Sequence, residues 1–293
     1  ATTLTWVADD GVWAVDYGHF EHCWSGSANN LNFLNGDSVV FSQAADVRLR
    51  GKVEPASVKI NLSSGTLRFL AEDAAACLAG KTALAIDAPG AAVEIHTANT
   101  FTGGTQMSAG ALSLGHAQAL GSGKVVLSGG SLDFNALAVA NAVQVKGAVE
   151  LLGGASYAGA LEVVSGSLSG DALSVAGDMQ VKSGSISNAL VGSGRVVKSG
   201  TGSVLLSGES SYSGGTRVSG GTLQLGSAQA LGSGEVSLPS GTLDAADHAF
   251  ANALTVEGTV SLHAAAYAGE LTLKSGRING SVLHLAQEAT LQS

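Results

Sequence analysis

The residues whose types and spacing could support catalysis are few and scattered along this sequence. Gly36-Asp37-Ser38 combines the small residues and the hydroxyl of a hydrolase nucleophile block. However, the triplet precedes the apolar run 39–41 (VVF) instead of following a strand, and no Asp-x-x-His block closes the chain. We therefore interpret it as a turn that enters a strand, and we expect no catalytic residue.

Two further motifs resemble ligand sites but lack essential parts. Residues 19–24 (HFEHCW) offer nitrogen and sulfur donors for a divalent metal, but the His-x-x-His pair has no helical spacing and no second ligand cluster. Residues 121–124 (GSGK) resemble the end of a phosphate loop, yet Val125 stands where Ser or Thr should bind magnesium. We expect a loop and a corner, and neither a metal nor a cofactor.

Paired carboxylates could cleave glycans only if they flank one bond from neighbouring positions. Asp133 and Asp244 are equivalents in an internal duplication and should lie about five coils apart. Other acidic residues that could cluster are Asp171 with Asp178, and Asp9 and Asp10 with Asp16. Solvated turns commonly carry such residues, so we keep a glycan-active β-helix enzyme only as an alternative.

Composition excludes several classes of function. The net charge is −9 with only 14 Lys and Arg residues, and no basic cluster is present that could bind nucleic acid. No uninterrupted apolar run is long enough for a membrane-spanning helix. The start at Ala1 is compatible with removal of a signal peptide, and whether Cys23 and Cys77 form a disulfide stays open.

An internal duplication organises most of the chain. Residues 101–133 align without gaps to residues 212–244 and are identical at 20 of 33 positions, so that residue 101 corresponds to residue 212. We predict a first copy over residues 81–190, a second copy over residues 191–293, and a different section over residues 1–80 that contains a cap and the first coils.

The local pattern within each copy predicts an all-β fold. Pieces of three to five residues alternate apolar and polar side chains, and Gly, Ser-Gly and Asn separate them every eight to twelve residues. At about 20 to 22 residues per coil, one copy makes about five coils and the chain about thirteen. We predict a right-handed parallel β-helix, a solenoid whose interior holds Leu112, Leu114, Val125, Leu127 and Leu132. Asn141 and Asn252 fall between strands, where they either cap corners or form side-chain ladders.

Residues 196–208 (VVKSGTGSVLLSG), followed by residues 212–216 (YSGGT) and 221–225 (GTLQL), resemble the autotransporter-associated β-strand repeat. The run 228–234 (AQALGSG) extends the resemblance, and residues 101–105 and 117–123 repeat these features. The first copy departs from the pattern at residues 87–90 (DAPG), where the second has Lys-Ser-Gly-Thr.

The resemblance implies a bacterial autotransporter passenger domain, exposed at the cell surface or secreted and exported through the outer membrane by a C-terminal translocator β-barrel of the full-length protein. We expect a non-enzymatic adhesin or structural stalk that binds a host glycan or protein, or a self-associating module. No nucleic acid and no membrane span within the chain are expected.

Overall fold

The computed structural model describes residues 2–15, 23–26, 32–264, 266–281 and 289–291. Among these residues the chain forms strands and turns, and the helical part is one 3-10 turn, η1 (Gly154–Ser156). The chain divides into two compact units, residues 1–144 and residues 145–293, and β13 (Val143–Leu152) contains the boundary. The predicted all-β solenoid of about thirteen turns is confirmed.

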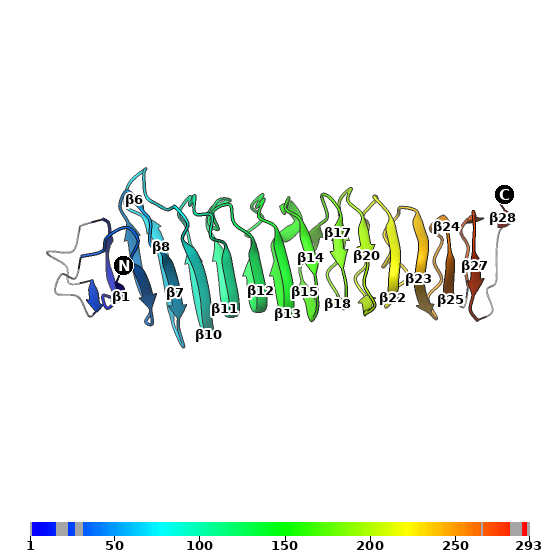
Figure 1. Ribbon diagram of the computed structural model, residues 1–293, viewed down its shortest axis with the longest axis horizontal. Coiled ribbons are helices and arrows are strands. Elements are labelled where there is room, and N and C mark those ends of the chain that lie inside the picture. The colour runs from blue at the N-terminus through cyan, green and yellow to red at the C-terminus, as the bar shows by residue number, and fades with distance from the viewer. Residues whose placement is uncertain (1, 16–22, 27–31, 265, 282–288, 292–293) are drawn as a thin grey trace. The chain divides into compact units, whose positions relative to one another are not determined.

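Two rows of parallel strand pairings form the main walls of unit 1, and they belong to one large sheet whose long strands pass from one wall to the other (Figure 1). The first wall contains β1 (Thr3–Trp6), β4 (Ser38–Phe41), β7 (Ser57–Asn61) and the first parts of β10 (Ala83–Ile95), β11 (Thr105–Leu114) and β12 (Val125–Asp133). The second wall contains β2 (Asp10–Trp13), β5 (Ala45–Leu49), β8 (Thr66–Ala71) and the second parts of β10, β11 and β12. The short strands β6 (Lys52–Val53) and β9 (Cys77–Leu78) pair in a separate small sheet.

Alternating burial along these strands builds the core. The five apolar residues predicted to face inward are all at most 1% exposed: Leu112, Leu114, Val125, Leu127 and Leu132. Leu112 pairs with Leu132 in the next coil, and Met107 pairs with Leu127. Stacking of like side chains removes apolar surface from water, and each fully buried Leu or Val stabilises the fold by about 1.5–3 kcal/mol relative to an exposed one.

The N-terminal coils are covered by a strand and an aromatic cluster. β3 (Trp24–Gly26) pairs with β1 in the antiparallel sense, with Trp24 opposite Trp6. The Trp6 and Trp24 ring centroids are 4.9 Å apart in an edge-to-face arrangement, and Trp13 lies 5.4 Å from Trp24. β3 thus occupies the edge of β1 that the parallel wall leaves open, which is a cap of the predicted kind.

Unit 2 has the same arrangement of strands. Its first wall contains β14 (Leu161–Val163), β17 (Met179–Val181), β20 (Val196–Lys198), the first parts of β22 (Thr216–Leu225) and β23 (Val236–Ala246), β24 (Leu254–Val256), β26 (Leu271–Leu273) and β28 (Ala289–Leu291). Its second wall contains β15 (Ser167–Gly170), β18 (Gly184–Ile186), β21 (Ser203–Leu206), the second parts of β22 and β23, β25 (Thr259–Ala264) and β27 (Arg277–Asn279). The short strands β16 (Leu173–Ser174) and β19 (Leu190–Val191) pair beside these walls.

Coil length varies more than the sequence predicted. Leu67 pairs with Val93, whereas Val256 pairs with Leu273, so the first of these coils is longer than the second by about half. The sheet register fixes the strands but not the loops between them, so the loops absorb the difference. Because short coils prevail in unit 2, one copy of the duplication corresponds to about six coils, and the prediction of about five was wrong.

Glycine permits the close approach of successive coils at the corner between the two walls. Gly184 has φ 112°, and a Cβ built there would lie 2.0 Å from the carbonyl oxygen of Gly166. Gly166 in turn has φ 90°, and a Cβ built there would lie 2.2 Å from the carbonyl oxygen of Gly147. A side chain at these positions would collide with the backbone of the preceding coil. The positive φ would also strain the backbone of any residue other than glycine.

Candidate functional site

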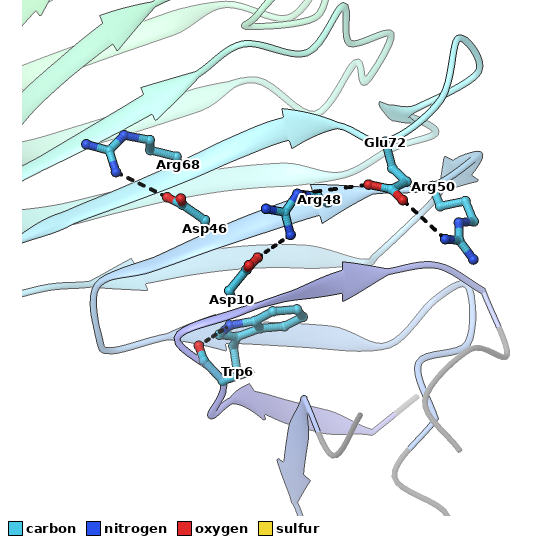
Figure 2. Close-up of polar contacts among 8 residues, drawn as sticks. Trp6, Asp10, Asp46, Arg48, Arg50, Arg68 and Glu72 are labelled. Carbon is cyan, nitrogen blue, oxygen red and sulfur yellow. Dashed lines mark hydrogen bonds and ion pairs between the residues drawn. The ribbon is translucent and has the colours of Figure 1, made fainter. Parts of the chain in front are cut away.

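A ladder of charged side chains covers the outer face of the second wall in unit 1 (Figure 2). Arg48 of β5 points toward Asp10 of β2 and bonds its carboxylate, and Arg50 reaches Glu72 with an Nη2–Oε1 distance of 3.3 Å. Arg68 of β8 lies between Asp46, at 3.2 Å, and Glu94 of β10, at 3.1 Å. We call these residues the charge ladder.

The members of the charge ladder neutralise one another. A hydrogen bond and charge from Asp10 raise the pKa of the Arg48 guanidinium, while a hydrogen bond from His96, assisted by Arg68, lowers the pKa of Glu94. These side chains are about one third exposed or more, so water screens the pairs and each contributes little to the stability of the fold. The charges of the ladder are therefore used in contacts between neighbouring coils.

Asp37 and Ser38, the suspected nucleophile block, belong to the turn before β4, as interpreted from the sequence. The Asp37 side chain is 7% exposed, and its carboxylate accepts hydrogen bonds from the backbone N–H of Thr2 at 2.7 Å and of Leu34 at 3.0 Å. The Ser38 hydroxyl contacts the hydroxyl of Ser57 at 3.0 Å, in the next coil. This carboxylate orders a loop, and no base approaches Ser38 among the described residues.

The suspected metal motif falls mainly outside the described residues, which do not include His19, Glu21 or His22. Cys23 is described and is buried, with its Sγ beside Gly11. Cys77 starts β9, opposite Lys52, and the two cysteines do not form a disulfide with each other. Across the described part of the chain, no group of three or more His, Cys, Asp or Glu side chains converges as metal ligands would.

Of the two roles expected for Asn141 and Asn252, the capping of corners is confirmed. Asn141 Nδ2 donates to the carbonyl oxygens of Gly121 at 3.2 Å and Gly123 at 2.8 Å. Asn252 Nδ2 donates in the same way to Gly232 at 3.1 Å and Gly234 at 2.8 Å. The suspected phosphate loop 121–124 is therefore a corner whose carbonyl oxygens, not its N–H groups, are held by an amide.

Three of the acidic candidates accept hydrogen bonds from backbone groups. Asp133 and Asp244 lie in different units and each accepts a hydrogen bond from the N–H two residues later, a short turn that ends the strand. Asp171 accepts from Gly153 N–H at 3.0 Å, and Asp9 accepts from Gln43. Asp16 lies outside the described residues, and Asp178 lines a small hollow beside β17.

Lys198 has a role that the sequence reading missed. It occupies an inward-facing position of β20, level with Val181 and Val218, and is fully buried. Its ammonium Nζ donates to the carbonyl oxygens of Ser199 at 2.8 Å, Gly200 at 3.3 Å and Gly220 at 3.0 Å. Burial lowers the pKa of Lys198, and the three carbonyls compensate for part of the lost hydration. The sequence did contain a signal for this buried role, because Lys198 occupies a position where the alternation of apolar and polar residues calls for an apolar side chain.

Two hollows lie on the outer faces of the first walls, one in each unit. The unit 1 hollow, of about 190 Å³, is bordered by Lys59, Asn61, Asp87 and Gln106 around Ala85. The small side chain of Ala85 lies between Lys59 and Gln106 in register, which creates the depression. None of the four polar side chains has a hydrogen-bond or ion-pair partner among the described residues.

The unit 2 hollow, of about 240 Å³, is lined mainly by charged side chains: Arg195, Arg217, Glu235, Ser237, Glu257 and Lys274. Arg217 Nη1 lies 3.2 Å from the Ser237 hydroxyl and 3.7 Å from Glu257 Oε2. Lys274 Nζ lies 3.7 Å from the other oxygen of Glu257. The residues come from five successive coils.

The two hollows overlap at two positions in the alignment of the copies. Gln106 is the equivalent of Arg217 in the alignment of the copies, as Val126 is of Ser237, and these residues line the hollows of unit 1 and unit 2 respectively. The hollows therefore share part of one outer face, but their other lining residues do not correspond, and the side chains are mainly neutral in unit 1 and mainly charged in unit 2. No short sequence motif predicts either hollow, because the residues that line each hollow are about one coil apart in the sequence.

The described part of the chain contains no helix that is long and apolar enough to cross a membrane. This finding concerns helices within the described ranges.

Comparison with protein families gives a match to the passenger-associated transport repeat at residues 95–114 and 196–225. These segments correspond to the end of β10 with β11, and to β20–β22. The match in the first copy begins after residues 87–90, where that copy departs from the repeat. Searches of curated proteins and of solved structures found no match. The repeat matches confirm the predicted resemblance to an autotransporter passenger that carries passenger-associated repeats.

Proposed function

We propose that this passenger is a non-enzymatic adhesive surface, displayed at the cell surface or released from it, whose outer sheet faces bind a glycan or protein ligand. The observation that carries the proposal is a hollow bordered by polar side chains on the outer face of each unit, the two hollows sharing the equivalent positions Gln106/Arg217 and Val126/Ser237. A repeat that serves only as a spacer has no need of such a hollow, whereas a binding surface gains from repeating one.

The interior supports the same view. Inward positions are filled by stacked apolar side chains and by Lys198, whose donors are all used by backbone carbonyls. Asp37, Asp133 and Asp244, three of the carboxylates suspected from the sequence, bind backbone groups at turns. The polar groups that remain available for a ligand therefore lie on the outer faces, where shallow contacts suit binding better than bond cleavage.

The experiment is a screen of the protein against glycan arrays and extracellular-matrix proteins, beside sedimentation velocity. We expect a saturable ligand for the monomer. Concentration-dependent association without a ligand would instead support a self-associating module. A monomer that binds nothing would indicate a stalk, and turnover of an arrayed glycan would indicate the enzymatic alternative; each of these results contradicts the proposal.

A further inference from the structure

The unit 2 hollow gathers an unusual share of the cationic side chains in an acidic protein. Arg195, Arg217 and Lys274 all line it, although the chain has only 14 Lys and Arg residues and a net charge of −9. Arg195 precedes β20 and Arg217 lies in β22, the next strand of the wall, where Val197 is level with Arg217. Their strands are therefore about one strand spacing, ~4.8 Å, apart.

These cations are only partly neutralised within the unit. The Arg195 guanidinium donates to the carbonyl oxygen of Gly214 at 3.5 Å and has no carboxylate partner among the described residues. Arg217 and Lys274 share one carboxylate, Glu257, at 3.7 Å each. Close charge-assisted pairs are shorter, at about 2.7–2.9 Å, so a ligand carboxylate can approach these cations without first breaking a tight pair.

The two glutamates of the hollow restrict the kind of anion that fits. Glu235 accepts a hydrogen bond from the Thr255 hydroxyl, and it still has acceptor capacity, as does Glu257. A compact multivalent anion such as phosphate would be repelled by both carboxylates. A sugar acid avoids this conflict, because its carboxylate binds the arginines while its hydroxyl groups donate to the glutamates.

We propose that the unit 2 hollow binds acidic sugar residues of a polysaccharide, with Arg195, Arg217 and Lys274 holding successive carboxylates and Glu235 and Glu257 accepting from hydroxyl groups. The proposal rests on the proposed adhesive function and names its ligand class. A linear acidic glycan lying along the wall would present its carboxylates to cations on different coils. Arginine suits this role because its planar fork matches a carboxylate.

The test is isothermal titration of the whole chain with a linear galacturonate oligomer, with a neutral galactose oligomer of equal length, and with citrate. We expect binding of the galacturonate oligomer alone, weakening as salt increases. Arg217→Gln and Lys274→Gln should each lower the affinity by about tenfold or more, as expected for the loss of a charged hydrogen bond. Arg277→Gln is the matched control, because Arg277 lies in β27 of the second wall and should leave the affinity unchanged.

Several results would overturn the assignment. Equal binding of citrate, or an equal loss with Arg277→Gln, would show attraction to charge in general. Absence of galacturonate binding in a correctly folded protein, checked by circular dichroism, would also reject it. In that case the array screen still decides the adhesive function separately, because a ligand found there would support adhesion at another site.

Discussion

Lys198 Nζ donates a hydrogen bond to the carbonyl oxygen of Gly220, 3.0 Å away and one coil later. The same ammonium binds Ser199 and Gly200 in its own coil, so one buried side chain joins two successive corners. The position faces the core, where the neighbouring coils place valine. A charge inside the solenoid is tolerated because its three donors meet three backbone acceptors.

Replacing this lysine should destabilise the second unit. Lys198→Met keeps an unbranched side chain but leaves buried carbonyl oxygens without a donor, and we expect the free energy of unfolding to fall by about 1–3 kcal/mol. Urea denaturation would measure the change, with Lys81→Met as the exposed control. An unchanged or higher midpoint would mean that desolvation of the ammonium outweighs its hydrogen bonds.

Tyr212 should make the fold sensitive to alkaline pH. Burial raises the pKa of its phenol to about 12, whereas an unfolded tyrosine has a pKa of about 10. The folded state therefore holds a proton that the unfolded state releases, so this contribution is complete below about pH 10 and is lost as the pH rises toward 12. We expect up to about 2.5 kcal/mol from this difference.

Tyr212→Phe isolates that contribution. Phe101 occupies the equivalent position of the first copy, so the ring fits the repeat. The variant should lose about 1 kcal/mol at pH 8, because it lacks the bond to the buried Thr216 hydroxyl. Between pH 10 and 12 its stability should fall less steeply than that of the wild type. Parallel curves would show that Tyr212 does not titrate in this range.

Gly184 should not tolerate even a methyl group. Gly184→Ala would bring a Cβ against the carbonyl oxygen of Gly166 and force a residue with a side chain to adopt φ 112°. We expect a loss of about 2–4 kcal/mol, measured by thermal unfolding. Gly177→Ala is the control, because a Cβ there would meet nothing within 4 Å. Equal effects of the two substitutions would argue against close packing at the corner.

Trp24 should hold the N-terminal cap in place. It is 2% exposed and packs edge-to-face on Trp6, so Trp24→Ala should cost about 3–5 kcal/mol. Because coils of a solenoid contact mainly their neighbours, we expect faster amide exchange in β1 and β2 and normal protection in β22. Val7→Ala, at a residue that is 44% exposed, should change neither the stability nor the amide exchange rates. Uniform loss of protection would show that the cap controls the whole fold.

The sequence was sufficient to predict the architecture because the relevant signals are local. Alternation around Leu112 and Leu114 defines the inward face, and the tandem copy shows that the unit is stacked. The unit 2 hollow could not be predicted in this way. Arg195, Arg217 and Lys274 become neighbours only through the sheet register, and the unequal lengths of the coils prevent that register from being counted along the chain.

The matched positions of the two copies have a genetic consequence. Residues 101–133 and 212–244 begin before β11 and β22 and end in the strands β12 and β23. Unequal recombination between these stretches would delete or add one whole copy while preserving the inward and outward alternation of every strand. A chain shortened or lengthened in this way would lose or gain whole coils, and the outer side chains of an added copy would be free to diverge while its inward face stayed apolar.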